Sequence, residues 1–136
     1  MKERVRAIIK KGNNILLIHR IKNGREYWVF PGGGVEKTDT DQKSALTREC
    51  IEELGVEVGV GDLFTTYKLG EVGNEQCEYF YFCEITGGEL GTGSGPEFQE
   101  GTHYEGMYNL EWIAFNNFST KNIQPEKVKK ELQKEA

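Results

Sequence analysis

The sequence has few cysteines and prolines, no long apolar run and no excess of basic charge. Its three cysteines, Cys50, Cys77 and Cys83, include no Cys-x-x-Cys pair and lie in apolar patterns. They are therefore expected to be free buried thiols and not disulfides or zinc ligands. No apolar stretch approaches the roughly 20 residues of a membrane-spanning helix, and none follows the basic N-terminus as in a signal peptide. We expect a soluble, cytoplasmic protein without a membrane partner.

Basic residues are outnumbered, because 17 Lys and Arg against 22 Asp and Glu give a formal net charge of −5. Binding the phosphate backbone of DNA or RNA requires a basic face, so the composition argues against a nucleic-acid polymer as partner. Small phosphates can still be bound through metal ions. With 136 residues, 37% of them hydrophobic, the chain is expected to form one domain over residues 1–136.

Turn signals divide the chain into short apolar segments that predict many strands and two helices. The expected strands cover residues 5–10, 15–19, 27–30, 56–60, 63–69, 76–85 and 108–115. The expected helices cover residues 41–54 and 125–134, the first with Asp39 or Thr40 as N-cap and Gly55 at its C-terminal end. Thr86 to Gly95 contains five glycines and is expected to be a surface loop, either a lid or a hairpin tip. The pattern predicts a mixed α/β domain with a helix-covered sheet.

Three carboxylates fall on one stripe of the first helix. Glu49, Glu52 and Glu53 are spaced i, i+3 and i+4, and Arg48 can offset their mutual repulsion only in part. Mg²⁺ suits such a stripe because it takes carboxylate oxygens together with substrate phosphates. The alternative is a merely charge-rich, exposed helix. The glycines at 32, 33 and 34 precede it and offer bare backbone groups to a metal or phosphate, which favours a binding site.

The segment from Gly33 to Val56 resembles the Nudix box, Gly-x5-Glu-x7-Arg-Glu-U-x-Glu-Glu-x-Gly-U, where U is bulky and apolar. The second half, from Arg48 onward, matches completely. In the first half, the family's Glu corresponds either to Asp39 with one extra residue after it, or to Thr40 with Gly34 as the opening glycine. That Glu pairs with the box Arg in the family. The run Trp28-Val29-Phe30-Pro31-Gly32-Gly33 extends the resemblance.

The resemblance implies an α/β/α sandwich with a mixed sheet, one catalytic helix and a C-terminal helix. It also implies hydrolysis, dependent on Mg²⁺ or Mn²⁺, of a nucleoside diphosphate linked to another moiety. By position, Glu49, Glu52, Glu53 and the Gly32 carbonyl are metal ligands, with one glutamate as base and Arg48 as an orienting group. Gly32, Gly33 and Gly34 approach the cofactor. A late loop often adds a carboxylate in this family, here Glu97 or else Glu100, and His103 is the alternative base.

The substrate is predicted from thinner signals. Tyr27 or Trp28 could stack on a base, although core packing is the alternative for both. The tail from Phe118 to Asn122 resembles that of MutT-type nucleoside triphosphate pyrophosphohydrolases, where an Asn reads a purine; a turn or cap is the alternative for Asn122. We expect a small nucleotide, most simply a nucleoside triphosphate, cleaved between its α and β phosphates. Dimers are common in the family, which favours a homodimer.

Two other classes compete with the hydrolase. In the first, the altered first half of the box marks a catalytically weak or inactive Nudix-fold module that binds nucleotides. The second is the isomerase branch of the superfamily, which acts on isoprenoid diphosphates with a catalytic Cys. No cysteine lies in the glycine-rich approach to the box, so we rank this class last.

Overall fold

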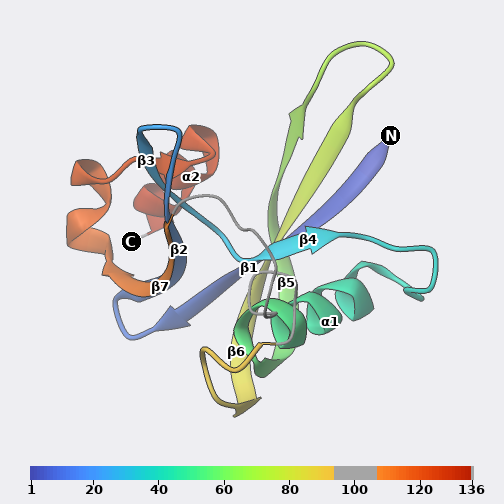
Figure 1. Cartoon of the computed structure of the whole chain (residues 1–136), viewed down its shortest axis with the longest axis horizontal. Coiled ribbons are helices and arrows are strands. Elements are labelled where there is room, and N and C mark those ends of the chain that lie inside the picture. The colour runs from blue at the N-terminus through green and yellow to red at the C-terminus, as the bar shows by residue number, and fades with distance from the viewer. Residues whose placement is uncertain (94–106, 136) are drawn as a thin grey trace.

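The computed structural model describes residues 1–93 and 107–135 (Figure 1). In chain order the elements are β1 (Lys2–Lys11), β2 (Asn14–Lys22), β3 (Arg25–Val29), β4 (Gly32–Gly34), α1 (Gln42–Leu54), β5 (Val56–Leu69), β6 (Gln76–Gly88), β7 (Met107–Ala114), the 3₁₀ helix η2 (Phe115–Thr120), β8 (Ile123–Gln124) and α2 (Glu126–Glu135).

The strands form one mixed sheet that is organised around β1. Its order is β5-β6-β1-β2-β3-β8, with β4 paired to β1 and β7 paired to β2. The β1–β6 and β3–β8 pairs are parallel, and the remaining pairs are antiparallel. Only the last residues of β1 pair with β2, while the earlier part of β1 lies between β4 and β6.

Helices cover the two faces of this sheet, because side chains alternate between the faces along each strand. Val5, Ala7 and Ile9 of β1 pack in one core with residues of α1. Ile8 packs in the other core with residues of α2. The predicted α/β sandwich with a mixed sheet is therefore confirmed, and α1 and α2 lie on opposite sides of β1 (Figure 1).

Several predicted boundaries were wrong. The expected strands 56–60 and 63–69 are one strand, β5, whose pairing with β6 shifts register at three places, as β-bulges do. The first three residues of the expected loop 86–95 belong to β6, because Gly87 and Gly88 pair with Glu57 and Val56. Strand pairing uses backbone groups, so the lack of side chains did not prevent it. The 3₁₀ helix η2 was not predicted.

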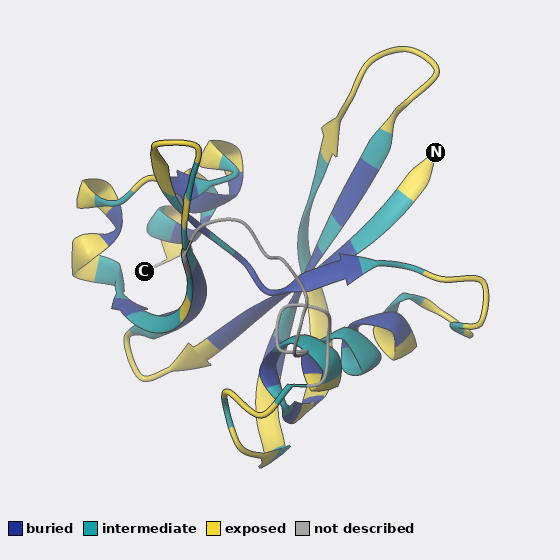
Figure 2. Ribbon diagram, in the orientation of Figure 1, coloured by how far each residue is buried: buried dark blue, intermediate teal, exposed yellow. Residues whose placement is uncertain are grey.

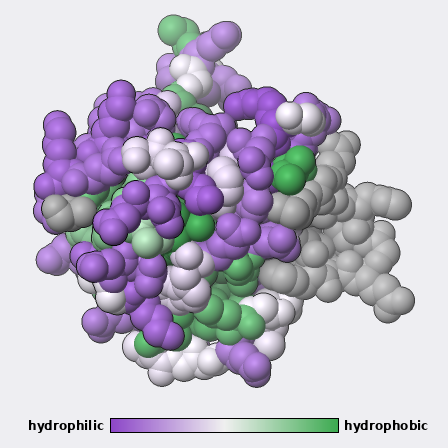
Figure 3. All heavy atoms as spheres, turned by 90° about the vertical axis from the view of Figure 1, so that its left-hand side faces the viewer, coloured by the Kyte–Doolittle hydropathy of each residue, from purple (hydrophilic) through white to green (hydrophobic). Residues whose placement is uncertain are grey.

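Exposure is concentrated at turns and at the outer faces of the helices. Figure 2 shows the buried residues along the middle of the sheet and the exposed ones at the tip of the long β5–β6 hairpin, where Val72 is 99% exposed. The face shown in Figure 3 is mostly hydrophilic, with small hydrophobic areas between polar side chains. In the described part of the chain, no helix is long and apolar enough to cross a membrane.

Candidate active site

Helix α1 is held at both ends and along one face. Asp41 is the N-cap, and its Oδ1 accepts from the Ser44 N–H at 2.7 Å. The prediction of Asp39 or Thr40 as N-cap was wrong, because Asp39 instead turns toward Arg48. Gly55 ends the helix in the left-handed conformation, at φ 80°, as predicted. Ala45, Leu46, Cys50 and Leu54 are the buried residues of the helix, and its carboxylates lie outside that buried face.

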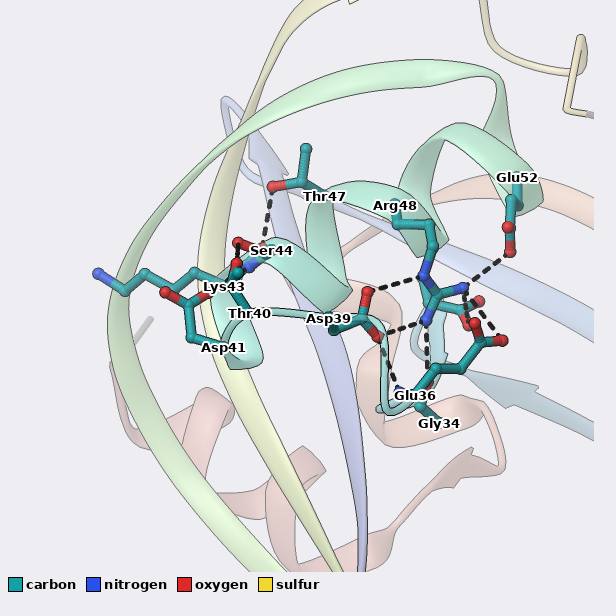
Figure 4. A network of polar contacts seen from close by, with 11 residues as sticks. Gly34, Glu36, Asp39, Thr40, Asp41, Lys43, Ser44, Thr47, Arg48 and Glu52 are labelled. Atoms are coloured by element: carbon teal, nitrogen blue, oxygen red, sulfur yellow. Dashed lines mark hydrogen bonds and ion pairs between the residues drawn. The ribbon is translucent and has the colours of Figure 1, made fainter.

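Arg48 is the centre of the polar network above α1 (Figure 4). Its Nε and Nη2 donate to the two carboxylate oxygens of Asp39, at 3.0 and 2.9 Å. Its Nη1 donates to Glu49 Oε1 and to Glu52 Oε2, both at 3.0 Å. The Gly34 carbonyl accepts from Nη2 at 3.1 Å. Such two-pronged contacts fix both the direction and the position of a guanidinium, so Arg48 orients two of the three glutamates.

Asp39 is therefore the residue that pairs with Arg48, and Thr40 is not. The Thr40 hydroxyl donates to Ser44 Oγ at 3.0 Å. The hydrogen bonds from Arg48 hold the pKa of Asp39 below its usual value, and those to Asp39 raise the pKa of Arg48. The side chain of Asp39 is only 6% exposed. Asp39 has a shorter side chain than the family's Glu and lies one residue farther from Arg48 than in the family pattern. It nevertheless accepts both hydrogen bonds from Arg48.

Strand β4 brings its glycine backbone against the glutamates. The Gly32 N–H donates to Glu53 Oε1 at 2.8 Å. A Cβ placed on Gly33 would lie 2.5 Å from both carboxylate oxygens of Glu49, far inside van der Waals contact. The residue at 33 must lack a side chain for Glu49 to lie where it does. This explains in steric terms why glycine occupies position 33.

Glu49 is more enclosed than Glu52, because its side chain is 15% exposed and that of Glu52 is 42% exposed. Burial raises the pKa of Glu49, and the hydrogen bond and charge of Arg48 act in the opposite direction. The nearby charges of Glu52 and Glu36 add to the rise. A cation near this carboxylate would favour its ionised form.

The structure thus brings Glu49, Glu52, Glu53, Arg48 and the glycines of β4 together. Hard oxygen donors of this kind suit Mg²⁺ or Mn²⁺. Within residues 1–93 and 107–135, however, no three His, Cys, Asp or Glu side chains are gathered closely enough to hold an ion as they stand. The carboxylate oxygens are of the kind that binds a divalent cation. In this structure they accept hydrogen bonds from Arg48 and from the Gly32 N–H. Glu97, Glu100 and His103 lie outside the described residues.

The residues predicted to read the base lie on the β2–β3 side of the sheet. Trp28 is 6% exposed, stacks on His19 at a ring separation of 4.2 Å and donates from Nε1 to Glu111 Oε1 at 3.1 Å. Asn122 donates from Nδ2 to the Glu26 carbonyl at 3.1 Å. Their substrate roles, and that of the half-buried Tyr27, stay predictions.

Sequence reasoning missed a charged cluster on the face of the sheet opposite α1. Arg4, Arg6 and Glu78 are brought together where β1 lies next to β6. Arg6 and Glu78 line a pocket of about 250 Å³ together with Phe30 and Phe80. The one available signal was the spacing of Arg4 and Arg6, two residues apart at the start of the apolar part of β1, which places both on the same face.

Three comparisons with known proteins agree with this geometry. A family model described as the NUDIX domain matches residues 1–131. The chain is 41% identical over 70 residues to the CTP pyrophosphohydrolase of Escherichia coli (strain K12), which covers 50% of this chain and 51% of that protein. The chain therefore matches about half the length of this relative.

Solved structures extend the likeness over most of the chain. The solution structure of the E. coli ORF135 protein superimposes with a TM-score of 0.70 at 27% identity, covering 94% of this chain and 84% of that one. The crystal structure of the MutT protein from Methanosarcina mazei Go1 superimposes with a TM-score of 0.69, covering 98% and 91% of the two chains. At 18% identity, the second likeness concerns the fold alone.

Proposed function

This chain belongs to the NUDIX domain family, and on that premise we propose that it is a Mg²⁺-dependent hydrolase of nucleotides. The proposed substrate is a nucleoside triphosphate or a related derivative, cleaved between the α and β phosphates. The observation that carries the proposal is the pairing of Arg48 with Asp39, Glu49 and Glu52. The CTP pyrophosphohydrolase activity that names the E. coli relative supports the same class of reaction.

The proposed roles follow from the contacts. Glu49, Glu52 and Glu53 would hold the cation, which would neutralise phosphate charge and acidify a bound water. Arg48 positions Glu49 and Glu52, and the Gly32 N–H positions Glu53. One of the three glutamates accepts the proton of the attacking water. Hydrolysis of a phosphoanhydride depends mainly on such positioning and charge neutralisation.

The competing hypothesis of an inactive binding module rested on the altered first half of the box. Its premise was that Asp39 or Thr40 would weaken the hold on Arg48. The two contacts from Arg48 to Asp39, at 3.0 and 2.9 Å, are those of a complete clamp. This supports hydrolysis over mere binding.

The test measures Mg²⁺-dependent product release from a panel of nucleoside triphosphates, sugar nucleotides and dinucleoside polyphosphates. Glu52→Gln and Glu53→Gln are compared with wild type, and Glu71→Gln on the exposed β5–β6 turn is the matched control. We expect wild type and the control to turn over one class, and both site variants to lose orders of magnitude in rate. Binding with Mg²⁺ but without turnover would favour the binding module instead.

A further inference from the structure

A histidine that the proposed chemistry does not use lies where β3 and β7 flank β2 (Figure 1). His19 of β2 is held between two carboxylates, with Nδ1 2.8 Å from Glu111 Oε2 of β7 and Nε2 2.7 Å from Glu26 Oε2 of β3. The side chain of His19 is only 12% exposed. One ring therefore joins the strands on both sides of β2 at a point largely removed from water.

These two contacts determine how many protons the ring carries. At neutral pH an ionised carboxylate accepts hydrogen bonds and donates none, so the ring must donate from both nitrogens, which only the imidazolium can do. Burial acts to raise the pKa of Glu111, but hydrogen bonds from Trp28 and His19 and the charges of His19 and Lys121 bring it below its usual value. Within residues 1–93 and 107–135, the charged groups that contact this cluster from neighbouring elements are Glu26, Glu111 and Lys121.

The charged ring holds Trp28 in place. His19 stacks on the indole with the ring centres 4.2 Å apart and the planes 10° from parallel. The indole Nε1 donates to Glu111 Oε1 at 3.1 Å, and Lys121 Nζ lies 5.0 Å from the ring centre. A cation on an indole face is attracted by the ring, most strongly where water is excluded. Loss of one proton from His19 would remove such a cation and leave one carboxylate without its donor.

Trp28 connects β3 to the segment that follows η2. Its backbone N–H donates to the Asn122 carbonyl at 2.9 Å, and Asn122 Nδ2 donates back to the Glu26 carbonyl at 3.1 Å. The parallel pairing of β3 with β8 begins at Trp28 and Ile123. The position of the indole therefore determines where both strands run.

Both strands lead into the candidate active site. Four residues that directly follow the paired positions line the pocket of about 250 Å³ on the face opposite α1, namely Val29, Phe30, Gln124 and Pro125. Arg6 of the same pocket is paired with Gly32, whose N–H donates to Glu53. A shift at Trp28 would thus reach the wall of the pocket within one or two residues.

We propose that His19 is a positioning residue whose doubly protonated ring fixes Trp28 and, through it, the two chain segments that form this pocket wall. Loss of the ring's charge as the pH rises loosens the wall and weakens substrate binding, while the glutamates of α1 keep their contacts. Proton binding at His19 and substrate binding therefore favour each other. The inference rests on the proposed function for the statement that a nucleotide substrate uses this pocket.

The test compares wild type with His19→Gln, Glu26→Gln and Glu126→Gln. Glutamine at position 19 can still donate to a carboxylate but carries no charge, and Glu26→Gln keeps the histidine and removes one of its two carboxylates. Glu126→Gln is the matched control, because it removes a carboxylate from an exposed pair on α2 at 3.9 Å.

Three measurements are made on each protein. The first is kcat and KM between about pH 6 and pH 9, with Mg²⁺, on the nucleoside triphosphate that wild type hydrolyses fastest. The second is metal-free binding of the nucleoside monophosphates over the same range. The third is the ¹H–¹⁵N spectrum of the imidazole and indole groups without ligand, in which His19→Gln assigns the signals of His19. The titrations of Mg²⁺ and phosphate are common to all four proteins.

We expect both ring nitrogens of His19 to be protonated in wild type at neutral pH. KM should rise by about 2- to 30-fold as the ring loses a proton, the range for one cation–π contact from exposed to desolvated, with no matching step in kcat. His19→Gln should have the higher KM throughout and no such step. In Glu26→Gln the step should move to lower pH, because one of the charges that favour the imidazolium is gone. The control should follow wild type.

A neutral His19 ring at neutral pH would overturn the proposal. A KM step that stays at the same pH in Glu26→Gln would also overturn it, and this variant decides the matter if His19→Gln does not fold. A lower kcat with unchanged KM in His19→Gln would mean that the ring acts on the glutamates instead. Failure of the proposed function looks different: wild type hydrolyses no triphosphate, while monophosphate binding still weakens as His19 loses its proton.

Discussion

The contact between Gly33 and Glu49 leads to a prediction that separates activity from stability. In Gly33→Ala the new Cβ would lie 2.5 Å from both carboxylate oxygens of Glu49, whereas ordinary contact begins at 3.4 Å. The carboxylate must therefore move by about 1 Å, and a displacement of that size can cost about 100-fold in rate. We expect kcat/KM for pyrophosphate release to fall by about this factor.

The fold should tolerate the same change. Gly33 has no positive φ, and alanine at a compatible position stabilises a protein by about 0.4–1 kcal/mol through the unfolded chain, which offsets part of the cost of moving Glu49. The melting temperature should stay within a few degrees of wild type. Gly59→Ala is the control, because its Cβ would meet only the Thr86 methyl group at 3.6 Å. Activity of Gly33→Ala within threefold of that control would refute the reasoning that Glu49 must lie against β4.

Three further predictions concern the same helix and its core. Asp39→Asn should lower the free energy of unfolding by about 1–2 kcal/mol, because charged hydrogen bonds to Arg48 are lost. The folded-state pKa of Asp39 is lowered. The difference between wild type and variant in urea titrations should therefore reach its full size above pH 3.8 and shrink as the pH falls further. Gly55→Ala should cost about 1–2 kcal/mol in the same assay, because a left-handed residue gains a Cβ that would also meet Thr92. Burial raises the pKa of Cys83 to about 12, so its thiol should resist a thiol reagent at pH 8 until urea unfolds the protein. For the same reason, the free energy of unfolding should fall as the pH rises above the ordinary thiol pKa of 9. Prompt labelling of Cys83 in the native state would contradict the burial.

The features that the sequence predicted are those specified by short stretches of chain. Helix α1 could be predicted because its apolar positions, its glycine stop and its carboxylate spacing lie within 14 residues. The partner of Arg48 could not be predicted, because the direction in which the loop before the helix turns decides whether Asp39 or Thr40 faces Arg48. The extension of β6 through Gly87 and Gly88 depends on pairing with Glu57 and Val56, which are 30 and 32 residues away.

The charged pocket was missed for the same physical reason. Arg6 and Glu78 are 72 residues apart, and only the parallel pairing of β1 with β6 sets them side by side. Alternation along β1 shows that Arg4 and Arg6 share a face. It does not show what that face meets, because the neighbour of a strand in a sheet is a property of the whole topology.

The central claim is that the carboxylates of α1 form the metal site of a nucleotide hydrolase. The most direct test is pyrophosphate release from nucleoside triphosphates by wild type and Glu53→Gln, each with Mg²⁺ and with EDTA. We expect turnover by wild type with Mg²⁺ alone, and a loss of several orders of magnitude in the variant with its melting temperature unchanged. Equal rates in the two proteins, or turnover that persists in EDTA, would contradict it.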